Sequence, residues 1–349
     1  MTTLFALGSN GSGQLGLGHD EDTSTRTLVQ TFPGKITRLA AGGNHTLILC
    51  GEQGRAFASG DDSDGRCGGL NQDANSFGRF REVVSSSGPW TDVAATWSAS
   101  ILSRAEGREV WVCGTGESGE LGLGGGVREA SCLTKVQSFP PEGRRVVQLA
   151  ACMAHVVAVL DDGTCWAWGK GRKGQLGGLK EDSWVPKRME GVKFEIKRAV
   201  CGKDFTCLVG GEGSGEVCLL GPEGRDRFGL KAGTPKSVSG SREVHASWGN
   251  VFVLHDNGGV IAWGRDDHGQ LSPQGLPSVA RIAAGSEHCL ALTLDGKVVA
   301  WGWGEHGNCG EPIDAKGDVR GKWNELPLSG RVEGLFAGCA TSFIAVAES

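Results

Sequence analysis

Short apolar runs alternate with turn residues along the whole chain and predict β-strands. Two such runs flank each small-residue turn, as in residues 36–42 followed by 44–49. The same pair recurs at 149–159 and at 282–292. Runs of five or six residues rich in β-branched and small side chains are typical of strands broken by a tight turn. We therefore expect each unit to begin with two antiparallel strands, A and B.

A hairpin follows in each unit and predicts a third strand, C. The dipeptides at 162–163 and 295–296 are both Asp-Gly, a turn signal when it stands between apolar runs. Weaker segments such as 27–32 offer an outer strand, D. Four antiparallel strands repeated around a ring are the blades of a β-propeller.

A nine-residue glycine-rich phrase follows strand C in every unit. Clear copies start at Gly8 (GSNGSGQLG), Gly114 (GTGESGELG) and Gly169 (GKGRKGQLG). Degraded copies start at residues 60, 221, 264 and 302, so that successive starts lie 38 to 55 residues apart. A recurring period of this length indicates a propeller or a repeat array. Seven copies predict seven blades.

The two ends of the chain are expected to complete one blade together. The chain starts at a strand C, residues 4–8, and finishes with an A–B half at 332–347. A solenoid would instead need polar capping units at its ends. The predicted fold is all-β, a seven-bladed propeller of four-stranded blades, occupying 1–349 as a single domain. The edge strand within 312–331 stays open.

The composition and charge of the chain argue against several classes of function, among them nucleic-acid binding and membrane insertion. The chain has 35 basic and 40 acidic residues and a formal net charge of −5. Its short basic stretches, 170–173 and 225–227, are interpreted as solvated loop charges rather than phosphate sites, so no direct nucleic-acid binding is expected. No apolar stretch approaches the length that spans a bilayer, and the start lacks a leader pattern. Twelve cysteines without a CxxC pair predict reduced, buried thiols in an intracellular protein.

Two patterns resemble catalytic or cofactor motifs. The dinucleotide fingerprint GxGxxG occurs at 11–16, 114–119, 169–174 and 302–307. No helical periodicity follows any copy, so we interpret these glycines as positive-φ positions in the loop between strands C and D. His45, His155 and His288 recur in the A–B turn, where a metal or general-base cluster is the alternative to a structural role that bridges backbone groups. The structural role is favoured, and we expect no catalytic residue, metal site or cofactor.

One face carries larger side chains than the repeated glycine-rich phrase requires. Strand alternation places the A–B turns and the C–D loops on the same face. There, the copy that starts at Gly302 has Trp303, Glu305 and His306 where small residues would suffice. Trp97 and Trp248 replace polar residues of the A–B turn, although each could fold back over its own blade. Aromatic residues converging on one face predict a protein-binding hot spot.

The Ala-Ala-Gly-x-x-His half and the Trp-Gly-x-x-x-x-Gly-Gln-Leu-Gly half resemble the repeat of the regulator of chromosome condensation family. Within that family, segments 15–22, 285–288, 301–310 and 337–341 are similar to bare propellers that act as accessory proteins of Elongator and diphthamide synthesis. This resemblance implies a non-enzymatic adaptor that forms a heterodimer with a small zinc-binding electron carrier of the CSL type. The expected location is the cytoplasm, with the nucleus as a further compartment, and Elongator is a candidate second partner whose direct contact the sequence leaves open.

The resemblance implies a role in diphthamide synthesis on elongation factor 2 and in Elongator-dependent modification of wobble uridines in tRNA. We expect the shared face to form the partner interface. The alternative is a guanine-nucleotide exchange factor for a nuclear small GTPase, although a basic tail and a long hairpin insertion are not evident. The expected partner-binding residues are Glu287, His288, Trp303, Glu305, His306, Asp204, Phe205 and Trp248.

Overall fold

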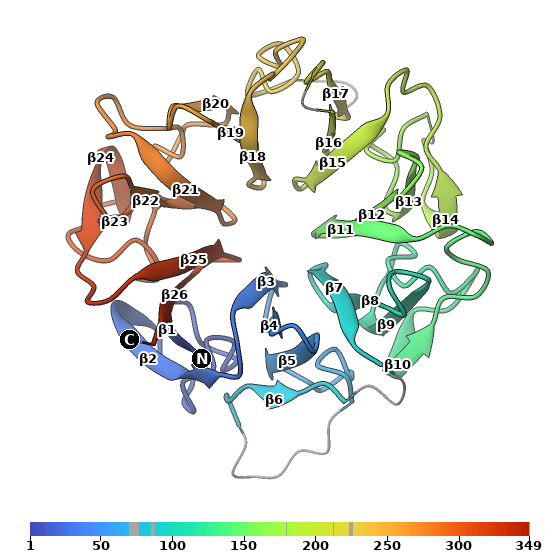
Figure 1. Cartoon of the computed structure of the whole chain (residues 1–349), viewed down its shortest axis with the longest axis horizontal. Helices are drawn as coiled ribbons and strands as arrows, with labels where there is room; N and C mark the ends of the chain where they lie inside the picture. The colour runs from blue at the N-terminus through green and yellow to red at the C-terminus, as the bar shows by residue number, and fades with distance from the viewer. Residues whose placement is uncertain (70–76, 85–87, 179, 212, 223–225, 349) are drawn as a thin grey trace.

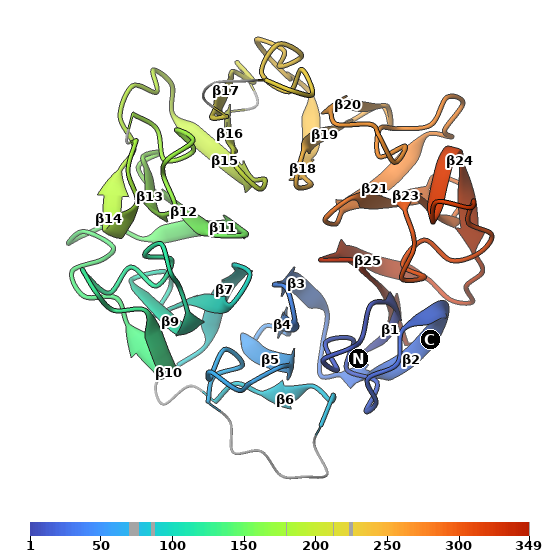
Figure 2. The ribbon, with the colours of Figure 1, turned by 180° about the vertical axis from the view of Figure 1, so that it is seen from behind.

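The chain folds into seven antiparallel sheets that stand as blades around a central axis (Figure 1; Figure 2). This computed structural model describes residues 1–69, 77–84, 88–178, 180–211, 213–222 and 226–348. Arg225, one of the basic residues considered above, lies outside the described residues. The predicted seven-bladed propeller is confirmed.

Five sheets have the predicted four strands, and four of them are continuous in sequence. Each of these four sheets is listed from its inner to its outer strand. The first two sheets are β3 (Ile36–Ala41), β4 (His45–Cys50), β5 (Arg55–Gly60) and β6 (Arg81–Glu82), and then β7 (Trp90–Ala95), β8 (Ala99–Arg104), β9 (Glu109–Thr115) and β10 (Glu129–Lys135). The other two are β11 (Val146–Cys152), β12 (His155–Leu160), β13 (Cys165–Gly169) and β14 (Ser183–Arg188), and then β21 (Val279–Ala284), β22 (His288–Thr293), β23 (Val298–Trp303) and β24 (Asp318–Leu326). Strand β24 supplies the edge strand that the sequence left open.

The fifth four-stranded sheet closes the ring with both termini, as expected. Its order is β25 (Val332–Ala337), β26 (Thr341–Ala347), β1 (Thr2–Gly8) and β2 (Thr23–Phe32). Strands β1 and β26 pair without interruption from Thr2 opposite Ala347 to Gly8 opposite Thr341. The first and last strands therefore share one hydrogen-bonded ladder, which joins the ring at this blade.

Two sheets have only three strands in the described part of the chain, which corrects the expectation of four in every blade. They are β15 (Ile196–Cys201), β16 (Thr206–Gly210) and β17 (Val217–Leu220), and β18 (Ser241–Ala246), β19 (Asn250–His255) and β20 (Val260–Gly264). After β17, pairing is reduced to a single bridge between Glu216 and Ser237. After β20, Pro273 and Pro277 interrupt the short segment before β21, and proline cannot donate to a strand ladder.

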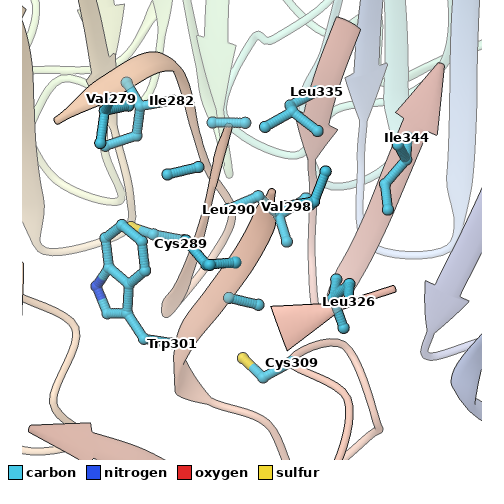
Figure 3. Close-up of a cluster of buried hydrophobic side chains, with 14 of the residues drawn as sticks. Val279, Ile282, Cys289, Leu290, Val298, Trp301, Cys309, Leu326, Leu335 and Ile344 are labelled. Carbon is cyan, nitrogen blue, oxygen red and sulfur yellow. The ribbon is translucent and has the colours of Figure 1, made fainter. Parts of the chain in front are cut away.

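Apolar side chains fill the spaces within and between blades. Figure 3 shows one such cluster, in which the Trp301 ring lies beside Cys289, its partner in the neighbouring strand. Around the axis, the inner strand ends at an alanine in five blades and at Cys152 and Cys201 in the other two. Small side chains are required there because the seven inner strands converge. This convergence explains the recurring Ala-Ala pattern.

All twelve cysteines are free thiols, and most of them are buried. Burial raises the pKa of the Cys113 thiol to about 12 and that of the Cys165 thiol to about 12. Such thiols behave as small apolar core residues. Among the described residues, no helix is long and apolar enough to cross a membrane.

Candidate functional site

The glycines of the repeated phrase hold the C–D loop against the A–B turn of the same blade. In the last copy, Gly302, Gly307 and Gly310 have φ values of +101°, +84° and +65°. A Cβ atom on Gly302 would lie 2.6 Å from the carbonyl oxygen of Glu287, and the amide of Trp303 donates to that oxygen over 2.9 Å. The turn and the loop therefore share one face, as predicted. No helix follows any described copy, which confirms the loop interpretation over the dinucleotide fingerprint.

His288 is a structural residue, which corrects its assignment to the partner interface. Its side chain is 1% exposed, and its Nε2 lies 2.9 Å from Ser342 Oγ of the neighbouring blade. Ser342 Oγ donates to the carbonyl oxygen of Asn308 over 2.7 Å. The hydroxyl therefore accepts from the imidazole, and the contact joins two blades. Burial lowers the pKa of His288 to about 4, so the ring is neutral at physiological pH.

His155 makes the same connection, with Nε2 3.0 Å from Thr206 Oγ1, which donates to the carbonyl oxygen of Gln175. These contacts favour the structural interpretation for His155 and His288, which link neighbouring blades through a hydroxyl, and His45 is likewise fully buried. A Cβ on Gly285 would overlap the His288 ring, which explains the glycine three residues before this histidine.

Phe205 occupies the histidine position of its own blade and is also withdrawn from the surface. Its side chain is 2% exposed, and its ring lies against Gly202. Phe205 cannot contact a partner in this conformation, because neighbouring residues already cover it. Its assignment to the interface is corrected in the same way as that of His288.

Trp303 is the centre of an aromatic cluster on the shared face. The His306 ring stands perpendicular to it, with centroids 5.3 Å apart, and the His268 ring lies 6.3 Å away. His306 Nδ1 is 2.7 Å from Asp22 Oδ2 in the loop between β1 and β2. Trp303 is half-buried and Glu305 is exposed beside it. Three expected residues are thus brought together at the junction of two blades.

An ion-pair network borders this cluster on the inner side. Arg265 contacts the carboxylates of both Glu287 and Asp267. His268 Nδ1 lies 2.8 Å from Asp318 Oδ1, and its Nε2 lies 3.8 Å from Glu287. Burial raises the pKa of Glu287, while the charge of Arg265 opposes that shift. Glu287 is therefore an organising residue whose carboxylate is only 10% exposed.

Trp248 lies at the mouth of the central channel. Its ring centroid is 6.2 Å from that of Trp97, which comes from the A–B turn of a blade on the other side of the axis. Both line a cavity of about 430 Å³ that follows the inner strands. Neither tryptophan is simply folded over its own blade, since the two meet across the mouth. Trp97 is 40% exposed, so the pair presents an aromatic surface at the centre of the face.

Asp204 lies next to this centre, where its carboxylate is 3.6 Å from Lys170 Nζ of the adjacent blade. Lys203 Nζ stands 5.4 Å from the centroid of Trp248. The amide of Trp248 donates to the carbonyl oxygen of Ser286 over 2.9 Å, which connects this group to the turn that carries Glu287. The two predicted groups of residues are therefore continuous across one face.

The sequence did not predict three residues of this site: Arg265, His268 and Asp318. His268 could have been found, because it occupies the fifth position of its glycine phrase, as His306 does in the next copy. Arg265 occupies the second position, where the last copy has Trp303. Asp318 carries no comparable signal, since it begins an edge strand outside the repeated phrase.

Comparisons with known proteins agree with this architecture. The model of the RCC1-like domain matches residues 3–344. The chain is similar to an RCC1 repeat-containing protein of Schizosaccharomyces pombe, with 32% identity over 99% of both chains. It is also similar to the secretion-regulating guanine nucleotide exchange factor of Bos taurus, with 29% identity over 96% of this chain and 81% of that protein. The crystal structure of Prp20p from Saccharomyces cerevisiae shares the fold, with a TM-score of 0.83 and 20% identity over 100% of this chain and 92% of that one.

Proposed function

Because the chain belongs to the RCC1-like domain family, we propose that it is a non-catalytic adaptor whose partner docks on the face of the A–B turns and C–D loops. The proposed partner is a small zinc-binding electron carrier of the CSL type, held in a heterodimer. The pair would act in diphthamide synthesis on elongation factor 2 and in Elongator-dependent modification of tRNA wobble uridines. This role extends the resemblance to bare propellers such as the alpha-tubulin suppressor.

The observation that carries the proposal is the half-exposed aromatic cluster around Trp303. The Trp303 indole already packs against the rings of His306 and His268, so it loses little conformational entropy when a partner covers it. Rigid aromatic residues surrounded by polar pairs are typical of binding hot spots. Glu305 and the imidazole of His306 add polar groups at the rim, where they can select a partner.

The direct test is a titration of purified protein with the zinc carrier, monitored by calorimetry. The Trp303→Ala/His306→Ala double variant should bind at least tenfold more weakly, because both rings of the cluster are lost. Leu294→Ala is the matched control, since Leu294 is 66% exposed in the β22–β23 hairpin on the opposite face. Unchanged affinity in a folded double variant would contradict the assignment.

A second candidate function is guanine-nucleotide exchange on a nuclear small GTPase. It is favoured by the similarity to a protein named as a guanine nucleotide exchange factor. A nucleotide-release assay separates the two proposals. Accelerated GDP release at a protein-to-GTPase ratio well below one would support the exchange factor, whereas a stable zinc-containing complex without such release would support the adaptor.

A further inference from the structure

A second surface on the same face combines positive charge with exposed aromatic rings. It is built by the turn and loop of the β15–β17 blade and by their neighbours in the blades on either side. Its position is next to the channel mouth, on the side of the ring away from Asp22. We call it the basic–aromatic sector, and its members are Lys170, Lys173, Lys203, Arg227, Phe228, Trp248 and Arg265.

One half of the sector joins the β11–β14 blade to the β15–β17 blade. Lys170 reaches across to Asp204, with Nζ and Oδ1 3.6 Å apart. The carbonyl oxygen of Lys173 lies 3.0 Å from the place that a Cβ atom on Gly221 would occupy. Two loops that are about 50 residues apart in the repeat are thereby in direct contact. The two loops therefore lie side by side on this face although the sequence separates them.

The other half extends from Trp248 toward the outer part of the ring. Lys203 stands over the Trp248 ring, and the Arg265 side chain packs beside Gly249. The guanidinium groups of Arg265 and Arg227 lie 5.2 Å and 5.1 Å from the centroid of Phe228. Phe228 is 38% exposed. Cation–π contacts thus keep both aromatic rings and their cations at the surface.

Three of the five cations of the sector form no ion pair in the described part of the chain, whereas Lys170 and Arg265 are paired with Asp204 and Glu287. Lys173, Lys203 and Arg227 are exposed, and none has a described carboxylate within ion-pair distance. On the Trp303 side of the face, His306 and His268 each contact a carboxylate, that of Asp22 and that of Asp318. The sector therefore gathers positive charge next to Trp248 and Phe228 on one face of a protein whose formal net charge is −5.

We infer that the basic–aromatic sector docks an acidic patch on a compact protein partner. This inference rests on the proposed function in taking that partner to be a protein. A nucleic acid fits less well, because a long polyanion would also meet exposed Asp20, Glu21 and Glu305 on the opposite side of the face. A compact partner can place its acidic patch over the sector and its neutral or basic surface over those carboxylates. The charge asymmetry then determines the orientation of the complex.

The test reverses the charge of the sector and of a matched surface. The Lys173→Glu/Lys203→Glu variant is compared with Lys35→Glu/Lys193→Glu, which has the same net charge and changes exposed lysines before β3 and β15 on the other face. Two probes are titrated by fluorescence anisotropy: the zinc carrier and a fluorescein-labelled decaglutamate peptide. The sector variant should bind both at least tenfold more weakly at low ionic strength, and the difference should shrink near 0.5 M salt, roughly, because screening weakens charge pairs.

The outcomes separate this inference from the proposed function. Equal affinities of wild-type and sector variant for both probes would overturn the inference, even if the carrier binds tightly. If the carrier fails to bind wild-type protein while decaglutamate binding depends on the sector, the proposed partner is wrong and the inference stands. Tighter, sector-dependent binding of a labelled single-stranded RNA than of decaglutamate would overturn it in favour of a nucleic-acid site.

Discussion

The copies of the glycine phrase that start at Gly169 and Gly302 lie in blades on opposite sides of the ring (Figure 1) and invite a direct comparison. Their first glycines have φ values of +94° and +101°, and a Cβ atom on either would lie 2.9 Å from the Cα of a buried histidine. Their variable positions differ completely. One copy carries Lys170 and Lys173, and the other carries Trp303 and His306.

The comparison distinguishes two kinds of position within the glycine phrase: glycines that maintain the loop conformation, and variable positions that determine its surface chemistry. The glycines adopt backbone conformations that other residues rarely reach, and they bring each loop onto its own A–B turn. Some of the intervening side chains, such as Lys173 and Glu305, are exposed and differ between the copies. In the Gly302 copy, His306 pairs with Asp22 of a neighbouring loop. In the Gly169 copy, Lys170 and Arg172 pair with Asp204 and Asp182, and Lys173 forms no ion pair among the described residues. The two copies therefore present different chemistry on one framework.

The largest expected effect comes from breaking the shared framework. Gly169→Ala and Gly302→Ala should each lower the free energy of unfolding by about 3 kcal/mol or more, because a Cβ at positive φ would strike the backbone of the turn. Urea unfolding at pH 7.5 measures the change. Gly11→Ala is the control, since Gly11 has an ordinary φ and open space around its Cβ position. A small effect in only one copy would show that the framework is not shared.

The buried histidines of the same two blades should produce a pH effect of intermediate size. The pKa of His155 and of His288 is lowered from 6.5 to about 4 by burial. Below pH 6.5 these histidines become protonated in the unfolded chain but stay neutral in the folded chain, so the free energy of unfolding falls as the pH drops toward 4. Each histidine should cost about 2 kcal/mol at pH 5 relative to pH 7.5.

Urea unfolding of wild-type protein and of the His155→Gln/His288→Gln variant at both pH values checks this expectation. Comparing the two pH values within each protein removes any loss of stability that the substitutions cause by themselves. The variant should lose about 4 kcal/mol less than wild-type between pH 7.5 and pH 5. Identical losses would show that these histidines become protonated without opening the fold.

The smallest effect concerns the surface pairs that distinguish the copies. His306 and Asp22 are 2.7 Å apart with side chains 38% and 40% exposed, so their coupling should not exceed about 1 kcal/mol. Lys170 and Asp204, 3.6 Å apart, should be coupled by about 0.3 kcal/mol or less. Double-mutant cycles with alanine measure both values. Stronger coupling at Lys170 would contradict the view that its sector is the less compensated side.

Much of the fold could be predicted because its cause is local. A fixed spacing of glycines, turn dipeptides and apolar runs specified the blades and the closure by both ends. Among the described residues no outer strand follows β17 or β20, which the strand pattern did not predict, although the shortened spacing after Gly221 and Gly264 pointed to it. Edge strands depend on a few hydrogen bonds and carry the weakest pattern.

The candidate site was predicted less well, because exposure is not a local property. His288 and Phe205 follow small-residue turns just as surface residues would, yet neighbouring blades bury them. Conversely, Trp303 and His306 were located correctly on the shared face, because strand alternation alone determines which loops emerge together. The contact of His306 with Asp22 joins opposite ends of the chain and carries no signal in either segment.

The sequence by itself determined the repeat, the ring and the face on which its irregular residues lie, since each follows from backbone constraints that act over a few residues. Only the tertiary structure decided which irregular residues meet. Trp97 meets Trp248 across the channel, and the loop of Lys173 lies against Gly221. These contacts depend on how the seven blades are arranged around one axis, and packing interactions between the blades determine that arrangement.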